Sequence, residues 1–176
     1  MREAVGEQVP IDRYYTLIDK IVDKWNMHKA AKEVIAKGGS AGIDGVSTAE
    51  FNEKYELNMR ELHRQLKHVT YQSLPVLRVY ISKSDGSERP LGVPTVKDRI
   101  AQGSVKEVME PIYEEIFCDC SLGFRKGKSQ IDAVNKVEEY REQGYKWVVD
   151  ADIKGFFDNI DHDLLIEFIR EEITDG

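Results

Sequence analysis

The stretch 148-VVDADIKGFFDNIDHDLL-165 carries the strongest indication of the fold. It opens with an apolar run that is typical of a buried strand. Because side chains alternate along a strand, Asp150 and Asp152 are expected on one face at the strand's end. A carboxylate at such a point is a common ligand for Mg²⁺ beside a phosphate. The stretch therefore predicts a metal-binding carboxylate, and Asp152 is the candidate.

Three other interpretations compete for the acids of this stretch. A calcium-binding loop starting at Asp150 would have Asp at positions 1, 3, 9 and 12 and Gly at position 6. However, Lys154 stands at a ligand position, and a strand-like segment, not a helix, precedes the loop. A D-x-D nucleophile of the phosphatase type would need partners further along the chain. The remaining acids are interpreted as caps and solvated residues of the last helix: Asp158, Asp161 and Asp163.

The charge of the chain is unevenly distributed. A net charge of −7 argues at first against a nucleic-acid partner. Between Arg60 and Lys106, however, nine cations stand against four anions, whereas from Asp150 to Gly176 nine acids stand against two cations. The polarised pattern leaves a basic half that is suited to phosphates. With 176 residues and 41% hydrophobic content, the chain is also large enough to bury a core.

The cysteines and the hydrophobic pattern bear on the compartment. Cys118 and Cys120 are too few for a zinc site. In an extended segment they would point to opposite sides and be badly placed for a disulfide, so free thiols in a reducing compartment are predicted. No apolar run approaches the ~20 residues that span a bilayer, and the N-terminus lacks a signal-peptide core. We expect a cytoplasmic protein without membrane contact.

Hydrophobic periodicity predicts an α+β fold that is rich in helices and contains one small antiparallel hairpin. Helical spacing covers residues 11–37, and the glycines of 38-GGSAGIDG-45 end it. Ser47 and Glu50 fit a capping box for a long helix to about residue 68. The segment 76–83 alternates as a strand, 84-SDGS-87 forms the turn, and 88-ERPLGVP-94 follows it.

The second half of the chain repeats the alternation of helix and strand. Thr95 and Asp98 begin a helix that Pro111 is expected to interrupt. Ser129 and Asp132 cap a helix to about residue 142. Residues 145–152 are predicted as a strand, and Asp161 caps the last helix.

Two basic segments are candidates for phosphate binding. Lys83 and Arg89 flank the hairpin turn and can present an ammonium and a guanidinium to one side, as a polyphosphate requires. In 121-SLGFRKGKSQIDAV-134, basic residues stand just before a helix N-terminus, where backbone donors favour a phosphate: Arg125, Lys126 and Lys128. Solvated surface cations and an ordinary basic loop are the respective alternatives.

Taken in order, four segments resemble the N-terminal half of bacterial group II intron reverse transcriptases, the maturases encoded within those introns. They are GGSAGIDGVS, VLRVYISKSDGSERPLGVPTVKDRIAQ, EPIYEEIFCDCSLGFRKGKSQIDAV and VVDADIKGFFDNIDHDLL. The resemblance runs from about residue 25 to 170 and implies part of a right-hand polymerase. It divides the chain into a helical extension with a template-covering loop (1–45), fingers (46–143) and the beginning of the palm (144–176).

The resemblance also implies roles for individual residues. Asp152, helped by the backbone carbonyl of Ile153, would bind the catalytic Mg²⁺. Phe157 would lie under the sugar of the incoming dNTP and leave no volume for a 2′-hydroxyl. Lys83 and Arg89 would bind the triphosphate. Contacts with template RNA are implied for Arg78, Pro90, Leu91, Gly92 and Val93, and for Arg125 and Lys128.

The chain departs from the family in one respect. The Tyr-Ala-Asp-Asp motif that supplies further catalytic carboxylates does not occur before Gly176. We therefore expect a fragment of a parent that copies RNA into DNA from a DNA primer and takes part in intron splicing and mobility. With one metal ligand, the fragment is expected not to extend a primer, and a non-catalytic RNA-binding module is the alternative. Palm surfaces left uncovered are expected to self-associate into a homodimer.

Overall fold

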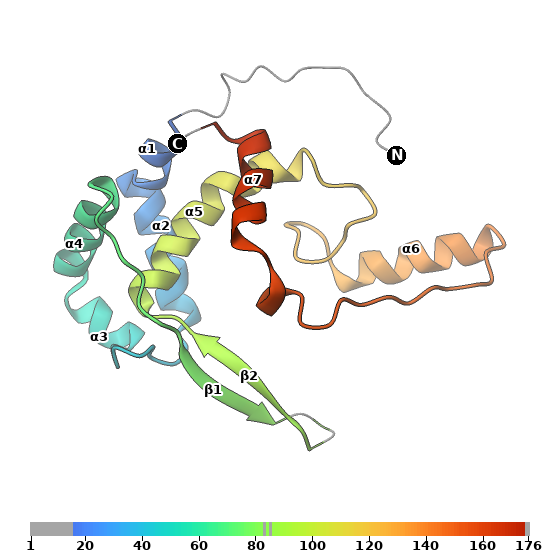
Figure 1. Cartoon of the computed structure of the whole chain (residues 1–176), viewed down its shortest axis with the longest axis horizontal. Helices are drawn as coiled ribbons and strands as arrows, with labels where there is room; N and C mark the ends of the chain where they lie inside the picture. The colour runs from blue at the N-terminus through green and yellow to red at the C-terminus, as the bar shows by residue number, and fades with distance from the viewer. Residues whose placement is uncertain (1–15, 83, 85, 175–176) are drawn as a thin grey trace. The chain divides into compact units, whose positions relative to one another are not determined.

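A computed structural model describes residues 16–82, 84 and 86–174 (Figure 1). The chain divides into two compact units, an N-terminal unit that extends to Pro111 and a C-terminal unit from Ile112 to Thr174. Helices dominate the described residues, and the one sheet among them is a two-stranded antiparallel hairpin. The predicted α+β composition is therefore confirmed. The division at residues 46 and 144, which follows the parts of a polymerase, stays a prediction.

The N-terminal unit contains the helices and strands α1 (Leu17–Ile21), α2 (Lys24–Lys37), α3 (Thr48–Glu53), α4 (Tyr55–Lys67), β1 (Leu77–Ser82), β2 (Glu88–Val93) and most of α5 (Val96–Glu114). Asp23 caps α2 by accepting hydrogen bonds from the N–H groups of Trp25 and Asn26. The predicted capping box of Ser47 and Glu50 is present at the start of α3. Residues 11–15 of the first predicted helix lie outside the described residues.

Two helix predictions were wrong in detail. The single helix expected from Ser47 to about residue 68 is two helices, because Lys54 leaves the helical conformation with φ −114° and ψ 34°. The Asn58 side chain donates to the Phe51 carbonyl at 3.0 Å and so bridges the break. Pro111 does not interrupt α5, which continues to Glu114. Proline removes one backbone donor, and the rest of the last turn still follows a helical path.

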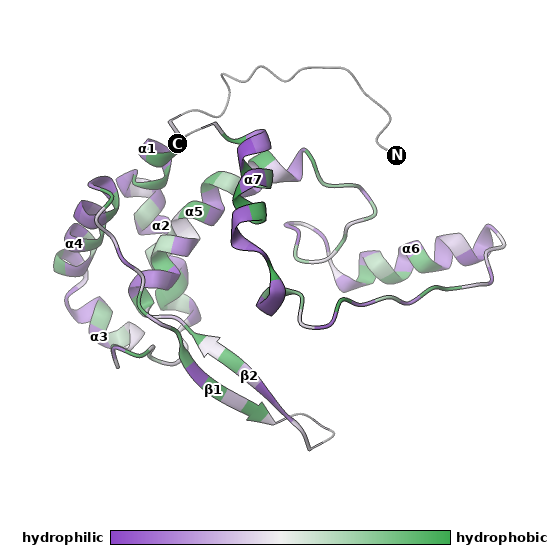
Figure 2. Ribbon diagram, in the orientation of Figure 1, coloured by the Kyte–Doolittle hydropathy of each residue, from purple (hydrophilic) through white to green (hydrophobic). Residues whose placement is uncertain are grey.

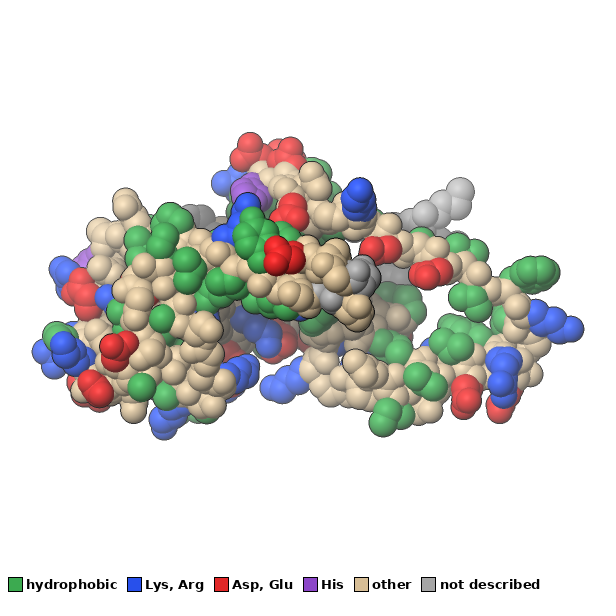
Figure 3. All heavy atoms as spheres, turned by 90° about the horizontal axis from the view of Figure 1, so that it is seen from below, with side chains coloured by type: hydrophobic (Ala, Val, Ile, Leu, Met, Phe, Trp, Pro, Cys, Tyr) green, Lys and Arg blue, Asp and Glu red, His purple; other side chains and the backbone are tan. Residues whose placement is uncertain are grey.

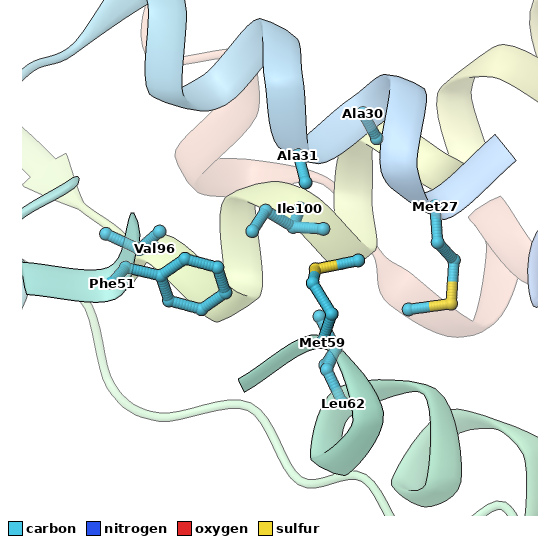
Figure 4. Packing of buried hydrophobic residues seen from close by; sticks show 8 residues of the cluster. All are labelled: Met27, Ala30, Ala31, Phe51, Met59, Leu62, Val96 and Ile100. Atoms are coloured by element: carbon cyan, nitrogen blue, oxygen red, sulfur yellow. The ribbon is translucent and has the colours of Figure 1, made fainter. Parts of the chain in front are cut away.

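The hydrophobic core lies where α2, α3, α4 and α5 meet (Figure 4). Its buried side chains are Met27, Ala30, Ala31, Phe51, Met59, Leu62, Val96 and Ile100. Helices α2 and α5 approach closely, because a Cβ at Gly103 would lie 3.2 Å from that of Ala30. The Asn26 side chain spans the same contact by donating to the Ser104 carbonyl at 3.0 Å. The middle of α5 is thus packed directly against α2.

The C-terminal unit comprises the end of α5, then α6 (Gln130–Glu142), the short 3₁₀ helix η2 (Phe157–Asn159) and α7 (His162–Glu172). Capping by Ser129 with Asp132 and by Asp161 is as predicted. Neither α6 nor α7 buries a residue. Hydrophobic residues occur along α6 (green in Figure 2), and apolar side chains of α6 and of the segment after it are exposed (Figure 3).

Two predictions for this unit were wrong. Residues 145–152 do not form a strand, because a strand needs a ladder partner and no described residue pairs with them. Cys118 and Cys120 do not point apart, because the backbone turns at Asp119 and Cys120 instead of running extended. Among the residues described, no helix combines the length and the apolar character that crossing a membrane requires.

Candidate nucleic-acid interface

The β1–β2 hairpin carries most of the predicted template and nucleotide contacts. Arg78 pairs with Gly92, Tyr80 with Pro90, and Ile81 with Arg89. Residues directly opposite each other in an antiparallel pair share a face. Arg78, Pro90 and Gly92 therefore lie on one face of the ribbon. Three further predicted residues lie on the other: Arg89, Leu91 and Val93.

Both arginines of the hairpin are available to a ligand. Arg78 and Arg89 are exposed, and apolar side chains such as Tyr80 and Leu91 stand exposed beside them. Cations interleaved with apolar and aromatic side chains suit nucleic acid, because the cations meet phosphates and the flat side chains meet bases. Lys83, the second predicted triphosphate ligand, lies outside the described residues.

The base of the hairpin is held by a buried hydrogen-bond network. Asp98 is only 4% exposed and accepts from the Tyr71 hydroxyl at 2.5 Å and from the Thr95 hydroxyl at 2.6 Å. The Asp98 N–H donates back to Thr95 Oγ1 at 3.1 Å and completes the cap of α5. Burial and the neighbouring Asp98 carboxylate raise the pKa of Tyr71, so its hydroxyl stays protonated as a donor. Residues on either side of the hairpin are thus tied to one carboxylate.

The glycine-rich loop 38–45 is attached to the same end of α5. The Arg99 guanidinium donates to the carbonyl of Ser40 at 2.8 Å and to that of Gly38 at 3.3 Å. A Cβ at Gly42 would lie 2.7 Å from both N and Cα of Thr95, a distance that no side chain tolerates. Glycine is therefore required at residue 42 for the loop to reach the helix. The contact places the loop beside the start of α5, and its covering of a template stays a prediction.

Packing at the hairpin also explains why residue 92 is a glycine. A Cβ there would lie 2.8 Å from Cγ2 of Val76, the residue just before β1. The Val76 side chain thus occupies the space where a side chain of residue 92 would lie. The predicted template contact of Gly92 stays a prediction, and packing against Val76 is its structural alternative.

Arg125 organises a loop in the C-terminal unit. Its side chain is 8% exposed and forms an ion pair with Glu114 at 2.8 Å. It also donates to the carbonyls of Cys118 at 2.9 Å and Ser121 at 3.1 Å, and it stacks over the ring of Phe117. The hydrogen bond from Arg125 lowers the pKa of Glu114. The guanidinium is therefore engaged within the loop, and its predicted phosphate contact is untested.

Lys128 is better placed for a direct phosphate contact, because it is exposed in the turn just before α6. That turn needs Gly127, whose φ is +73°. The N-terminus of α6 itself is already capped, since Ser129 Oγ accepts from the Asp132 N–H and the Asp132 carboxylate accepts from Ser129. These bonds lower the pKa of Asp132. A phosphate would thus depend on the lysine side chain more than on the helix end.

Asp152, Ile153 and Phe157 lie in an exposed part of the C-terminal unit. Asp152 follows the unpaired segment, and a turn at residues 154–156 leads into η2. Gly155 adopts φ +63°, and its carbonyl accepts from the Asn159 side chain at 2.7 Å. The ring of Phe157 is 84% exposed and contacts that of Phe156. The turn therefore presents a carboxylate and an aromatic ring within six residues of each other.

The donor set does not amount to a metal site. Within the described ranges, no three residues among His, Cys, Asp and Glu gather where they could share an ion. Mg²⁺ is usually held by one or two carboxylates together with substrate phosphates, and Asp152 supplies one carboxylate with the Ile153 carbonyl beside it. The same observation leaves the calcium-loop interpretation without support.

The predicted residues fall into three groups by element. Arg78, Arg89 and residues 90–93 share the hairpin, Arg125 and Lys128 share the loop before α6, and Asp152, Ile153 and Phe157 lie in the segment that leads into η2. Their convergence on one nucleotide stays a prediction. The sequence reasoning missed the supporting roles of Tyr71, Arg99 and Gly42. Only the four glycines of the 38–45 loop signalled any of these contacts.

Comparison with known proteins gives consistent matches. Residues 81–175 match the family model described as reverse transcriptase (RNA-dependent DNA polymerase). The chain is 34% identical to Protein YkfC of Escherichia coli K12, across 98% of this chain and 46% of that protein. It is also 34% identical to the Group II intron-encoded protein LtrA of Lactococcus lactis subsp. cremoris, across 99% of this chain and 29% of that protein.

A solved structure matches as well. The Cas6-RT-Cas1–Cas2 complex contains a chain that aligns with 99% of this one at a TM-score of 0.56 and 25% sequence identity. The aligned part is 18% of that chain. The protein therefore spans less than half the length of each of these relatives.

Proposed function

Because the chain belongs to the reverse transcriptase family of RNA-dependent DNA polymerases, we propose that it binds template RNA and an incoming dNTP for RNA-directed DNA synthesis. The observation that carries this proposal is the exposed hairpin with Arg78 and Arg89, fixed to α5 by the buried Tyr71–Asp98–Thr95 network. An anchored ribbon presents its cations in a defined geometry, which a mobile basic tail does not. Preorganised cations suit the charge of a triphosphate and of a template backbone.

Each part has a role in this proposal. Arg89, together with Lys83, binds the triphosphate, and Arg78 with residues 90–93 holds the template strand. Lys128 contacts a phosphate, and Arg125 maintains the conformation of the loop to which Lys128 belongs. Phe157 packs against the sugar and excludes a 2′-hydroxyl by its volume. Because the chain is similar to a group II intron-encoded protein, we propose an intron RNA as the RNA partner, and the longer protein would assist splicing and mobility.

Metal-assisted nucleotidyl transfer by these 176 residues alone is not supported, because no three His, Cys, Asp or Glu side chains of the described residues gather where they could share an ion. The family acts with Mg²⁺, and Asp152 is the residue we propose as a ligand. We predict RNA binding without primer extension. A non-catalytic RNA-binding role is thus the second candidate function, and the observation that favours it is that the described carboxylates do not cluster into a metal site.

Salt-dependent binding of RNA tests the proposal. Fluorescence anisotropy with a labelled single-stranded RNA would compare Arg78→Ala with Lys32→Ala, an exposed cation on α2. Each lost phosphate contact is expected to reduce the slope of log K against log salt by about one. The Lys32 variant should keep the slope of the wild type. Equal slopes in all the proteins would show that the hairpin does not contact RNA phosphates. Primer extension by the wild type would refute the non-catalytic assignment.

A further inference from the structure

A β-turn in the C-terminal unit brings the two cysteines of the chain together. The Ser121 N–H donates to the Cys118 carbonyl at 2.9 Å and closes the turn. Within it, Sγ of Cys118 lies 2.6 Å from Sγ of Cys120, and both residues are exposed. The Cys120 N–H also points at the Cys118 sulfur, at 3.4 Å. The turn therefore places the two thiols side by side.

The surroundings of the pair favour thiol chemistry over metal binding. Zinc needs four ligands, or three with an open position, and no third His, Cys, Asp or Glu joins the pair within the described residues. The Arg125 guanidinium donates to the Cys118 carbonyl at 2.9 Å and so fixes the turn from one side. Its positive charge also lies near the Cys118 sulfur.

The two thiols are not equivalent. Hydrogen bonds from the Cys120 thiol and the Cys120 N–H lower the pKa of Cys118, with a smaller contribution from Arg125. The hydrogen bond and the charge of Cys118 raise the pKa of Cys120. Since the thiolate is the nucleophile in exchange reactions, Cys118 is the residue that attacks first and Cys120 the one that reacts second.

We propose that Cys118 and Cys120 form a thiol–disulfide exchange site for low-molecular-weight disulfides of the glutathione class. The Cys118 thiolate attacks one sulfur of the small disulfide, whose S–S bond breaks. A mixed disulfide forms, and one small thiolate leaves and takes up a proton. The Cys120 thiol then loses its proton to water, and its sulfur attacks Cys118 Sγ. The second small thiol departs, so two protein thiols are oxidised as one small disulfide is reduced to two thiols.

A disulfide across a single intervening residue closes a small, strained ring. Strained, exposed disulfides have higher reduction potentials than structural ones and are the labile members of their class. The product therefore returns readily to the dithiol when thiols are in excess. Reversible modification of the loop that Arg125 organises is the expected outcome, in contrast to permanent cross-linking.

Reaction with oxidised glutathione tests the assignment. The folded wild type, Cys118→Ser and Cys120→Ser would be incubated with oxidised glutathione. The reactions would be quenched in acid, and the mass of each intact protein would be measured by mass spectrometry. The wild type should lose the mass of two hydrogens and accumulate little adduct. Cys120→Ser should accumulate at least about tenfold more mixed disulfide, because nothing resolves it. Cys118→Ser should react more slowly than Cys120→Ser.

Two outcomes would overturn the proposal. One is a wild type that accumulates as much glutathione adduct as Cys120→Ser, which would mean that the second thiol does not resolve the first. The other is a wild type that takes up no glutathione and forms no disulfide at a concentration that modifies a short unstructured peptide carrying the same thiols. Circular dichroism of the three proteins before the reaction establishes that the exposed serine substitutions leave the helices intact.

Discussion

Replacement of Gly42 by alanine tests how the glycine-rich loop is seated on α5. The new Cβ would lie 2.7 Å from N and Cα of Thr95 and 2.9 Å from the Pro94 carbonyl carbon. All three are backbone atoms, so the overlap is relieved only if the loop or the start of α5 moves. Overpacking of this kind costs about 1–3 kcal/mol. Because three backbone atoms overlap, we expect the upper part of this range, about 2–3 kcal/mol. Alanine recovers about 0.4–1 kcal/mol by restricting the unfolded chain, which leaves a net loss of about 1–2.6 kcal/mol.

Urea denaturation measures this loss. Trp25 lies in the N-terminal unit, and Trp147, the other of the two tryptophans, lies in the C-terminal unit and is 93% exposed. A Trp147→Phe background therefore makes tryptophan fluorescence report on the unit that contains Gly42. The denaturation midpoint of Gly42→Ala should fall below that of the background protein. Hydrogen exchange at residues 95–99 should accelerate, because the loop no longer covers them.

A second glycine of the same loop provides the control. Gly45 has φ +70° and open space around its Cβ position. Gly45→Ala should cost about 1–2 kcal/mol through its left-handed conformation but leave exchange at residues 95–99 as in the background protein. If Gly42→Ala matched the background within about 0.5 kcal/mol, the range of neutral surface substitutions, the close approach of the loop to Thr95 would be refuted.

Three further predictions concern the remaining contacts. Tyr71→Phe removes a hydrogen-bond donor from buried Asp98 and should lower the free energy of unfolding, measured by urea denaturation, by about 1–3 kcal/mol. Tyr80→Phe on the exposed hairpin should leave it nearly unchanged. Equal effects of the two substitutions would contradict the buried network. The pKa of Glu114 is lowered in the folded chain, so the ionised carboxylate stabilises the fold. This stabilisation is complete above about pH 4.5, the ordinary pKa of Glu, and is lost as the pH falls through the lower folded value. Glu114→Gln should flatten that part of the stability profile, and an unchanged profile would contradict the pairing with Arg125. Exposed apolar side chains on α6 and residues 147–149 should produce a concentration-dependent mass in analytical ultracentrifugation that Val137→Glu reduces; a constant monomer mass would count against the homodimer.

Local sequence signals predicted the parts of the fold that depend on neighbours in the chain. Ser47 with Glu50, Ser129 with Asp132, and Asp161 each cap the helix that follows them, because the donors and acceptors involved lie within three residues. The hairpin could be predicted in the same way, since its turn and its alternating strands are adjacent in sequence. Contacts of this range need no knowledge of the rest of the molecule.

Contacts between distant residues could not be predicted in the same way. The Tyr71–Asp98 hydrogen bond spans 27 residues, and the bond from Arg99 to Ser40 spans 59. Nothing in the local pattern distinguishes these side chains from solvated ones. The directions of the two cysteine side chains were predicted wrongly for a different reason. An extended backbone was assumed where Asp119 and Cys120 form a turn. A side-chain direction inferred from an assumed backbone inherits the error in that backbone.

The segment 145–152 shows why the two halves of the candidate site differ. Its residues have the β-branched and aromatic character of a strand, yet Trp147 is 93% and Val149 92% exposed, because no described residue offers them a ladder. The hairpin needs no such partner, since β1 and β2 satisfy each other. Cations on a self-paired hairpin are positioned by β1 and β2 themselves, whereas Asp152 follows a segment that has no such partner among the described residues. Binding through Arg78 and Arg89 should therefore not depend on residues 145–152, and a metal-binding role of Asp152 stays a prediction.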